Sequence, residues 1–248
     1  MQMHGALVVH KPAELTSSDC VTRLKWAFVN HGYHDKKIRI GHGGTLDPFA
    51  TGVLIVLFGE ATKLADTYLH SKKNYSGLIQ LGTQTDTADL TGESIASEAV
   101  PSLTETQWNT LAQQFVDADY FQTPPMYSAK KKNGIAFHEL ARKGIEIERE
   151  SILKKIYSYQ IKKITEDQLT FEVECESGTY VRTLAEDLAK KAGTLAHLKT
   201  LCRSRSSDCS LNESLPLDTL LTFISNKTPL EMITAYRPLH SLASHLSK

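Results

Sequence analysis

The chain has 248 residues, of which 41% are hydrophobic, so it can bury one large core or two modest ones and is not expected to be disordered. Its formal net charge is zero, which argues against a simple polycation that coats nucleic acid. No cationic segment leads into a long apolar run at the N-terminus, and we expect neither a signal peptide nor a membrane span. Four cysteines without the spacing of a zinc site indicate buried or incidental thiols in a reduced, cytoplasmic setting.

The charges are distributed unevenly along the chain. Residues 81–123 contain seven acidic residues and no lysine or arginine, whereas residues 124–163 contain ten basic residues against four glutamates. Residues 190–205 add five more basic residues and no acidic one. Segments this basic can form a surface that faces phosphates despite overall neutrality. Ordinary solvated faces are an equally good interpretation of the charge pattern alone.

The first 81 residues show the apolar patterns of short strands and helices, separated by glycine and proline. The expected elements, in chain order, are a strand at 6–9, a helix capped by residues 16–19 and ended by Gly32, a buried strand at 53–58, a helix at 61–69 and a strand at 75–81. A basic, glycine-rich connection at residues 36–47 leads into the buried strand.

The remaining residues continue this pattern after a long polar loop at residues 83–93. The elements expected there are a helix opened by Thr104 with Gln107 in a capping box, a turn at 132–134, a short helix through Arg142, a hairpin of residues 152–164 and 168–174, a helix at 180–192 and a helical pattern at 217–224. Strands follow one another without regular βαβ crossovers. We therefore expect an α+β fold, with a mixed, mainly antiparallel sheet and flanking helices.

One domain is expected over residues 1–216, with a basic insertion at about 124–155. Residues 217–248 form a short C-terminal tail that is too small for a second unsupported compact domain. We expect the tail to pack on the main body.

The segment GHGGTLDP at residues 41–48 is the most unusual stretch in the sequence. Its glycines allow the backbone to approach a ligand closely, and Pro48 restricts Asp47 to an extended conformation, which fixes the direction of the carboxylate. The loop could instead hold a phosphate, but it lacks the spacing of either common glycine-rich phosphate motif. A tight turn that Asp47 merely caps is the plain structural alternative.

Two further segments carry residues with possible chemistry. Residues 177–184, SGTYVRTL, join a strand end to a helix start and place Arg182 on the first helical turn. Such an arginine is more often a solvated side chain or part of a structural ion pair than a catalytic group. The segment KNY at residues 73–75 precedes LGTQTDT at 81–87, and Tyr75 alone would pass for a core aromatic.

Together these segments resemble the TruB family of tRNA pseudouridine synthases, whose hallmark GHxGTLDPxAxG corresponds to residues 41–52. The ordered resemblance covers approximately residues 6 to 216. The other matching segments are Lys11-Pro12 with Thr16-Ser17, residues 81–92, residues 125–130, residues 141–144 and residues 177–184.

The resemblance implies an enzyme that converts uridine to pseudouridine in the T-loop of tRNA, at position 55. Asp47 matches the family's catalytic aspartate, Arg182 its basic partner and Tyr75 the aromatic ring that stacks on the flipped uracil. The reaction is redox-neutral, so no cofactor and no metal are expected. Whether Asp47 adds covalently or draws a proton from the ribose to form a glycal stays open.

Substrate contacts are implied for several other positions. His42 should occupy the space that the flipped base leaves in the RNA, and Tyr180 and Leu201 should line the base pocket. Lys11 and Lys130 are further expected contacts, and the basic insertion resembles the segment that closes over the tRNA arm. His42 could otherwise be a turn residue, and Tyr180 and Leu201 could be ordinary core.

The sequence also departs from the family pattern. Glu14 stands where a turn glycine is usual, His10 precedes Lys11 where Asp or Asn is common, and Cys202 lies where arginine is frequent. The tail is too short for the PUA domain of many relatives, so we expect a stand-alone enzyme that needs no guide RNA. The alternatives are an RNA-binding module with an idle site and a nucleotide-binding protein.

Overall fold

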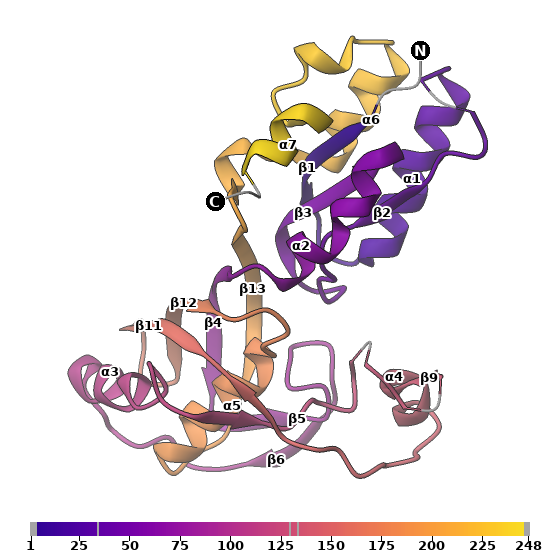
Figure 1. The fold of residues 1–248 in the computed structure, drawn as a ribbon. Coiled ribbons are helices and arrows are strands. Elements are labelled where there is room, and N and C mark those ends of the chain that lie inside the picture. Colours follow the sequence, from indigo (N-terminus) through magenta and orange to yellow (C-terminus); the bar gives the residue numbers. More distant parts are fainter. Residues whose placement is uncertain (1–3, 34, 129, 133, 246–248) are drawn as a thin grey trace. The chain divides into compact units, whose positions relative to one another are not determined.

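The computed structural model describes residues 4–33, 35–128, 130–132 and 134–245. The chain forms two compact units (Figure 1): unit 1 comprises Met1–Asn74 and Cys202–Lys248, and unit 2 comprises Tyr75–Leu201. The chain passes between the units twice, within strands β4 (Lys73–Leu81) and β13 (Ala196–Ser206). Unit 1 is therefore discontinuous in sequence, and unit 2 is inserted into it.

The sheet of unit 1 is built around β1 (Gly5–Lys11), whose apolar residues are buried on both faces. Strand β3 (Thr51–Phe58) pairs antiparallel along one edge of β1, with Leu7 opposite Val56. Strand β3 also pairs with β2 (Ile40–His42) and with the end of β13, and β13 pairs with β14 (Cys209–Ser210). Strand β1 also pairs with β15 (Leu215–Pro216) and β16 (Tyr236–Pro238).

Helix α1 (Ser17–Asn30) begins where the sequence predicts it, because Thr16 and Asp19 form a reciprocal capping box. It contacts α6 (Leu217–Ser225) from the C-terminal segment, and strands β15 and β16 of that segment pair with β1. The other helical segments of unit 1 are η1 (Gly59–Leu64), α2 (Ala65–His70), η2 (Leu211–Glu213), η3 (Leu230–Met232) and α7 (Leu239–His245).

Unit 2 carries a sheet in the order β11 (Ile156–Lys163), β12 (Gln168–Cys175), β4 and β13. Helix α3 (Glu105–Gln113) packs on β11 and contacts α5 (Val181–Lys191). Its short elements are the strand pairs β5 (Thr83–Thr85) with β6 (Ser94–Ser97), β7 (Tyr120–Gln122) with β10 (Ile152–Lys154) and β8 (Lys131–Lys132) with β9 (Ile135–Ala136), and helix α4 (Phe137–Ala141).

The α+β class with a mixed, mainly antiparallel sheet is confirmed. The single strand expected at residues 152–164 is wrong, because the chain changes partners at Lys155: β10 pairs with β7, and β11 pairs with β12. The helix expected at 61–69 is η1 followed by α2. The loop at 83–93 contains β5, and the turn expected at 132–134 includes Asn133, which lies outside the described residues.

No helix among the described residues is both long enough and apolar enough to cross a membrane.

Candidate active site

The loop of residues 43–50, called the Asp47 loop below, belongs to unit 1, and side chains and backbone groups from several other segments bind its backbone. Five successive carbonyl groups, from Gly44 to Pro48, each accept a hydrogen bond. The donors are Arg203 Nη2 to Gly44 O (3.0 Å), Arg203 Nη1 to Thr45 O (3.2 Å), Ser17 Oγ to Leu46 O (3.3 Å), Ala50 N to Asp47 O (3.1 Å), and Lys11 Nζ (3.1 Å) and Glu14 N (2.8 Å) to Pro48 O. The loop backbone is thus held from β1, α1 and β13, while the Asp47 side chain stays half-buried.

Lys11, at the end of β1, is fully buried. Its ammonium donates to the carbonyls of Pro12 (2.7 Å), Leu15 (2.7 Å) and Pro48 (3.1 Å). Burial lowers the pKa of Lys11 to about 8, although the electrostatic influence of Cys20 and Asp47 acts in the opposite direction. This environment favours a role in fixing the Asp47 loop over a direct contact with a substrate.

Arg203 on β13 is 2% exposed and donates from all three types of guanidinium nitrogen. Besides its two bonds to the loop, Nε donates to Val53 O at 2.8 Å. Its backbone pairs with Gly52, where an added Cβ would lie 2.3 Å from Arg203 O. Gly52 also has a φ of +106°, so only glycine suits this close approach. The interpretation of Arg203 as part of a phosphate-facing basic segment is therefore wrong.

His42, on β2, lies at the start of the loop and is half-buried. Its Nδ1 accepts a hydrogen bond from Gly44 N at 3.3 Å, which requires Nδ1 to be unprotonated. Burial lowers the pKa of His42, and the positive charge of Arg203 lowers it further. A neutral imidazole at pH 7 follows from both observations.

Arg182, in the first turn of α5, is 2% exposed. Its Nη1 donates to Thr87 O at 2.6 Å and its Nη2 to Tyr127 O at 2.7 Å. Nη1 also lies 3.7 Å from the carboxylate of Asp89, which is 4% exposed. Within unit 2, Arg182 therefore joins the loop at residues 83–93 to the start of the basic insertion.

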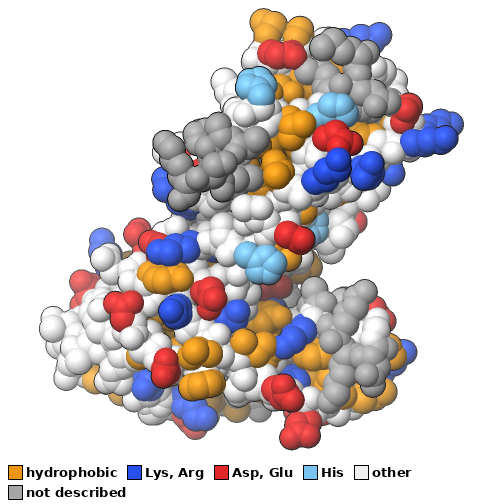
Figure 2. All heavy atoms as spheres, in the orientation of Figure 1, with side chains coloured by type: hydrophobic (Ala, Val, Ile, Leu, Met, Phe, Trp, Pro, Cys, Tyr) orange, Lys and Arg blue, Asp and Glu red, His pale blue; other side chains and the backbone are white. Residues whose placement is uncertain are grey.

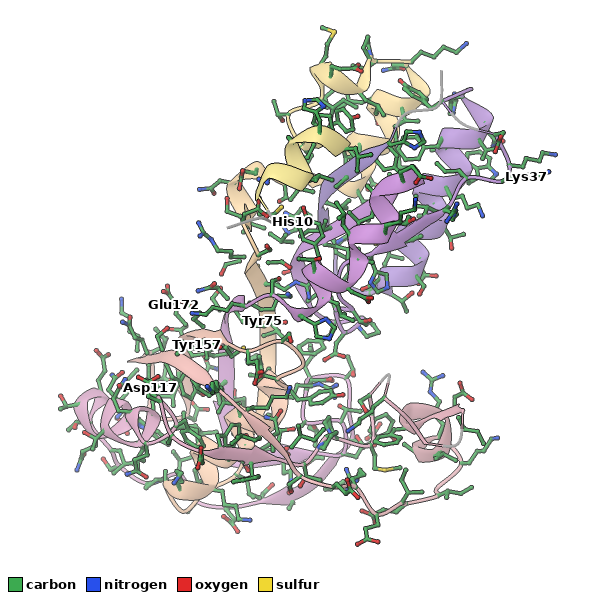
Figure 3. The ribbon with its side chains drawn as sticks, viewed as in Figure 1. His10, Lys37, Tyr75, Asp117, Tyr157 and Glu172 are labelled. Carbon is green, nitrogen blue, oxygen red and sulfur yellow. The ribbon has the colours of Figure 1, made fainter. Side chains whose placement is uncertain are left out.

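The other predicted site residues of unit 2 lie on separate elements. Tyr75 is near the start of β4 and is partly exposed (Figure 3), while Leu201 on β13 is buried. Tyr180 is the N-cap residue of α5, and its backbone exchanges two hydrogen bonds with the Gln122 side chain, at 2.7 and 2.9 Å. Lys130 is exposed. Lys11, His42 and Asp47 thus belong to unit 1, and the remaining predicted residues belong to unit 2.

Sequence reasoning misses the roles of Ser17 and Arg203. The pattern assigns Ser17 only to the helix cap, yet its hydroxyl also accepts from Leu46 N at 2.9 Å. Side chains two residues apart on a strand lie on the same face of the sheet. Arg203 lies two residues after Leu201 on β13, and both side chains are buried, so the alternation along this strand could have identified Arg203.

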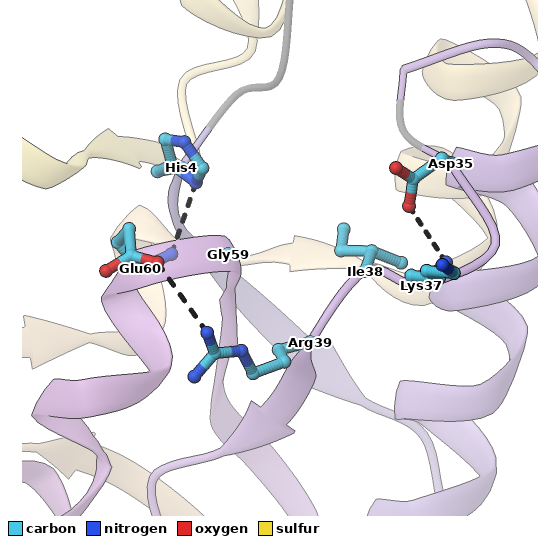
Figure 4. A pocket seen from close by; sticks show the side chains of 7 residues that line it. All are labelled: His4, Asp35, Lys37, Ile38, Arg39, Gly59 and Glu60. Carbon is cyan, nitrogen blue, oxygen red and sulfur yellow. Dashed lines mark hydrogen bonds and ion pairs between the residues drawn. The ribbon is translucent and has the colours of Figure 1, made fainter.

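A separate pocket of about 230 Å³ lies in unit 1 (Figure 4). It is lined by His4, Asp35, Lys37, Ile38, Arg39, Gly59 and Glu60. Its polar groups bind one another: His4 accepts from Glu60 N at 3.2 Å, and Arg39 lies 4.0 Å from the Glu60 carboxylate. We assign no ligand to it. Among the residues that the structure describes, no group of three or more His, Cys, Asp or Glu side chains could hold a metal ion.

A family model described as the N-terminal domain of TruB family pseudouridylate synthases matches residues 32–181. The chain belongs to the TruB family. This membership confirms the resemblance seen in the sequence motifs, including the segment around Asp47.

TruB-family relatives match most of the chain. The tRNA pseudouridine synthase B of Opitutus terrae is 37% identical over 97% of both chains. That of Psychrobacter arcticus is 43% identical over 89% of this chain and 57% of its own length, and that of Psychrobacter cryohalolentis is 41% identical over 95% and 64%. The chain thus spans about three fifths of the two Psychrobacter relatives.

A solved structure supports the TruB-family fold. The crystal structure of a Cbf5–Nop10–Gar1 complex contains a chain with a TM-score of 0.71 and 24% identity, over 97% of this chain and 62% of that chain. At this identity the likeness concerns the fold alone.

Proposed function

We propose that this chain converts uridine to pseudouridine in tRNA, at the T-loop uridine of position 55, with Asp47 as the catalytic carboxylate. The observation that carries the proposal is the hydrogen bonding of five successive carbonyl groups of the Asp47 loop, Gly44 to Pro48, which fixes the backbone that presents one half-buried carboxylate. Relatives named tRNA pseudouridine synthase B support the choice of substrate.

The proposed reaction breaks the bond between C1′ of the ribose and N1 of uracil, turns the base and forms a bond from C1′ to C5. The proton on C5 leaves and N1 gains a proton, so atoms and electrons balance without an oxidant or a reductant. Asp47 would act as an ionised, oriented carboxylate, either as a nucleophile or as a base toward the ribose. The chemistry therefore calls for no redox cofactor.

The uridine would have to leave the RNA stack to reach Asp47. In this proposal Tyr75 stacks on the extruded uracil, Tyr180 and Leu201 line its pocket, and His42 takes the vacated place in the RNA. A neutral His42 suits that place, because a flat uncharged ring can replace a base in a stack. Arg182 is the proposed cationic partner of Asp47.

Exposed basic side chains of the two basic segments would hold the tRNA through its phosphates. Those whose exposure the structure describes are Lys130, Arg142, Lys143, Lys155, Lys162, Lys190, Lys191, Lys199 and Arg205. On the face drawn in Figure 2, the described lysines and arginines alternate with carboxylates. Dispersed contacts of this kind position an RNA without reading its bases, and we expect tRNA affinity to fall steeply with salt.

The test is to incubate the purified chain alone with an unmodified tRNA transcript and to map pseudouridine by carbodiimide labelling and primer extension. A stop at the T-loop uridine is expected, with none in a matched transcript that carries cytidine at position 55. The reaction should proceed without guide RNA, and it should survive EDTA when a pre-folded stem-loop is the substrate. In the cell, we expect it to take place in the cytoplasm. Stops at other uridines, or dependence on an added RNA, would contradict the proposal.

A further inference from the structure

We propose that Arg203 is a positioning residue for catalysis, and that its guanidinium fixes the conformation of the Asp47 loop so that the carboxylate faces the uridine. This inference rests on the proposed function. It concerns a residue that would not touch the substrate and that acts through Asp47.

The three hydrogen bonds of Arg203 reach both sides of Asp47 along the chain. Gly44 O (3.0 Å) and Thr45 O (3.2 Å) precede the aspartate, and Val53 O (2.8 Å) follows it on β3. One rigid group therefore ties the entry of the loop to the strand that leaves it. The Asp47 carboxylate lies on the segment that this group spans.

The other side chains that hold the loop act elsewhere on it. Within the loop, Lys11 reaches Pro48 O, after the aspartate, and Ser17 reaches Leu46, before it. Arg203 differs from both, because its bonds lie before and after Asp47.

Only arginine fits this task among the cationic side chains. Its planar guanidinium offers donors in fixed, divergent directions, whereas a lysine ammonium is a compact charge at the end of a flexible chain. In a site that is 2% exposed, water cannot replace a lost donor easily. Substitution by lysine should keep the charge while releasing at least one of the carbonyls.

The deciding experiment compares Arg203→Lys with Arg23→Lys, a matched change at an exposed position on α1 in the same unit. Wild-type activity on the tRNA transcript is measured first, so that a failure of the proposed function is recognised separately. Single-turnover tritium release from 5-tritiated uridine gives the chemical rate, and filter binding gives the tRNA affinity.

We expect Arg203→Lys to lower the single-turnover rate about 100-fold, the scale of a misplaced catalytic group, while tRNA affinity stays within about threefold. Arg23→Lys should keep the wild-type rate. In the Arg203→Lys variant, hydrogen exchange should become faster at the amides of Leu46 and Ala50, and should be unchanged in the α1 amides after residue 20. This split between loop and helix would not arise from general destabilisation.

A second variant, Arg203→Ala, tests the same idea by rescue. Guanidinium chloride at non-denaturing millimolar concentration should restore part of the rate, and sodium chloride at the same concentration should not. Near-wild-type rates in Arg203→Lys would overturn the proposal. So would a loss of cooperative unfolding in both variants, because Arg203 would then be required for the fold of unit 1 itself.

Discussion

The Ser17 hydroxyl and the Leu46 backbone exchange two hydrogen bonds, with Oγ donating to Leu46 O at 3.3 Å and accepting from Leu46 N at 2.9 Å. This pair links the first residue of α1 to the residue just before Asp47. The position of the proposed catalytic carboxylate is therefore coupled to the N-terminus of a helix whose own cap is Thr16.

Ser17→Ala should destabilise the chain by about 1–2 kcal/mol, because the buried amide and carbonyl of Leu46 lose their partner. At this chain length the melting temperature should fall by roughly 2–8 °C. Ser18→Ala is the matched control, since Ser18 is exposed on the same helical turn. Equal melting temperatures for the two variants would show that the Ser17–Leu46 pair contributes nothing.

Asp47→Asn should abolish turnover, because an amide can act neither as a nucleophile nor as a proton acceptor. Affinity for tRNA should change by less than about tenfold, or roughly 1.4 kcal/mol, since other residues supply most of the binding. Tritium release and filter binding on one preparation measure both, with the exposed Asp66→Asn as control. Residual tritium release beyond a small fraction of the wild-type rate would exclude Asp47 as the catalytic carboxylate.

Glu14→Gly should stabilise the chain, because Glu14 has a φ of 69°, in the left-handed region that costs a non-glycine residue about 1 kcal/mol or more. Greater freedom of glycine in the unfolded chain offsets part of this, which leaves a net gain of up to about 1 kcal/mol. Ala13→Gly has no positive φ to relieve and should be destabilising. Denaturant titration of both variants should give opposite signs.

Arg182→Met should destabilise unit 2 by about 3 kcal/mol or more, because the buried carboxylate of Asp89 loses its cation. Adding Asp89→Asn should recover part of this loss. Trp108 is buried in unit 2 and Trp26 is exposed in unit 1, so fluorescence in a Trp26→Phe background follows unit 2. Additive effects of the two substitutions would refute the pairing of Arg182 with Asp89.

His42 should titrate below 6.5, because burial and Arg203 lower its pKa. The unfolded imidazole binds its proton near pH 6.5 and the folded one only at lower pH. Its contribution to stability is therefore complete above pH 6.5 and is lost as the pH falls through the folded pKa. Between pH 7 and 5 the melting temperature should drop less in His42→Gln than in wild type, and an NMR titration of His42 at or above 6.5 would contradict this.

Local sequence predicted the elements whose signals are local. The capping boxes at Thr16 and Thr104 and the apolar run that became β3 define their elements without help from the rest of the chain. Strand β13 was not predicted from the sequence, because its residues include lysine, arginine and serine and few apolar side chains. The change of strand partner at Lys155 was not predicted either, because the partner of β10 is β7, where Gln122 pairs with Ile152 30 residues later.

The site divides in the same way. The GHGGTLDP motif identified Asp47 because glycine and proline act through their own backbone. The donors that fix the loop come from Lys11, Ser17 and Arg203, up to 159 residues away, and pairing at that distance leaves no trace in a local pattern.

The edge of β1 that faces β15 and β16 has a consequence for how the protein is made. Its partners at residues 215–238 emerge from the ribosome about 200 residues later, which takes roughly 10–40 s at typical rates of synthesis. During that interval β3 can pair with one edge of β1. The other edge of β1 then exposes unpaired backbone amides and apolar side chains to neighbouring nascent chains. Overexpression at low temperature lengthens the interval, so chaperones that bind extended apolar segments should raise the soluble yield most when translation is slow.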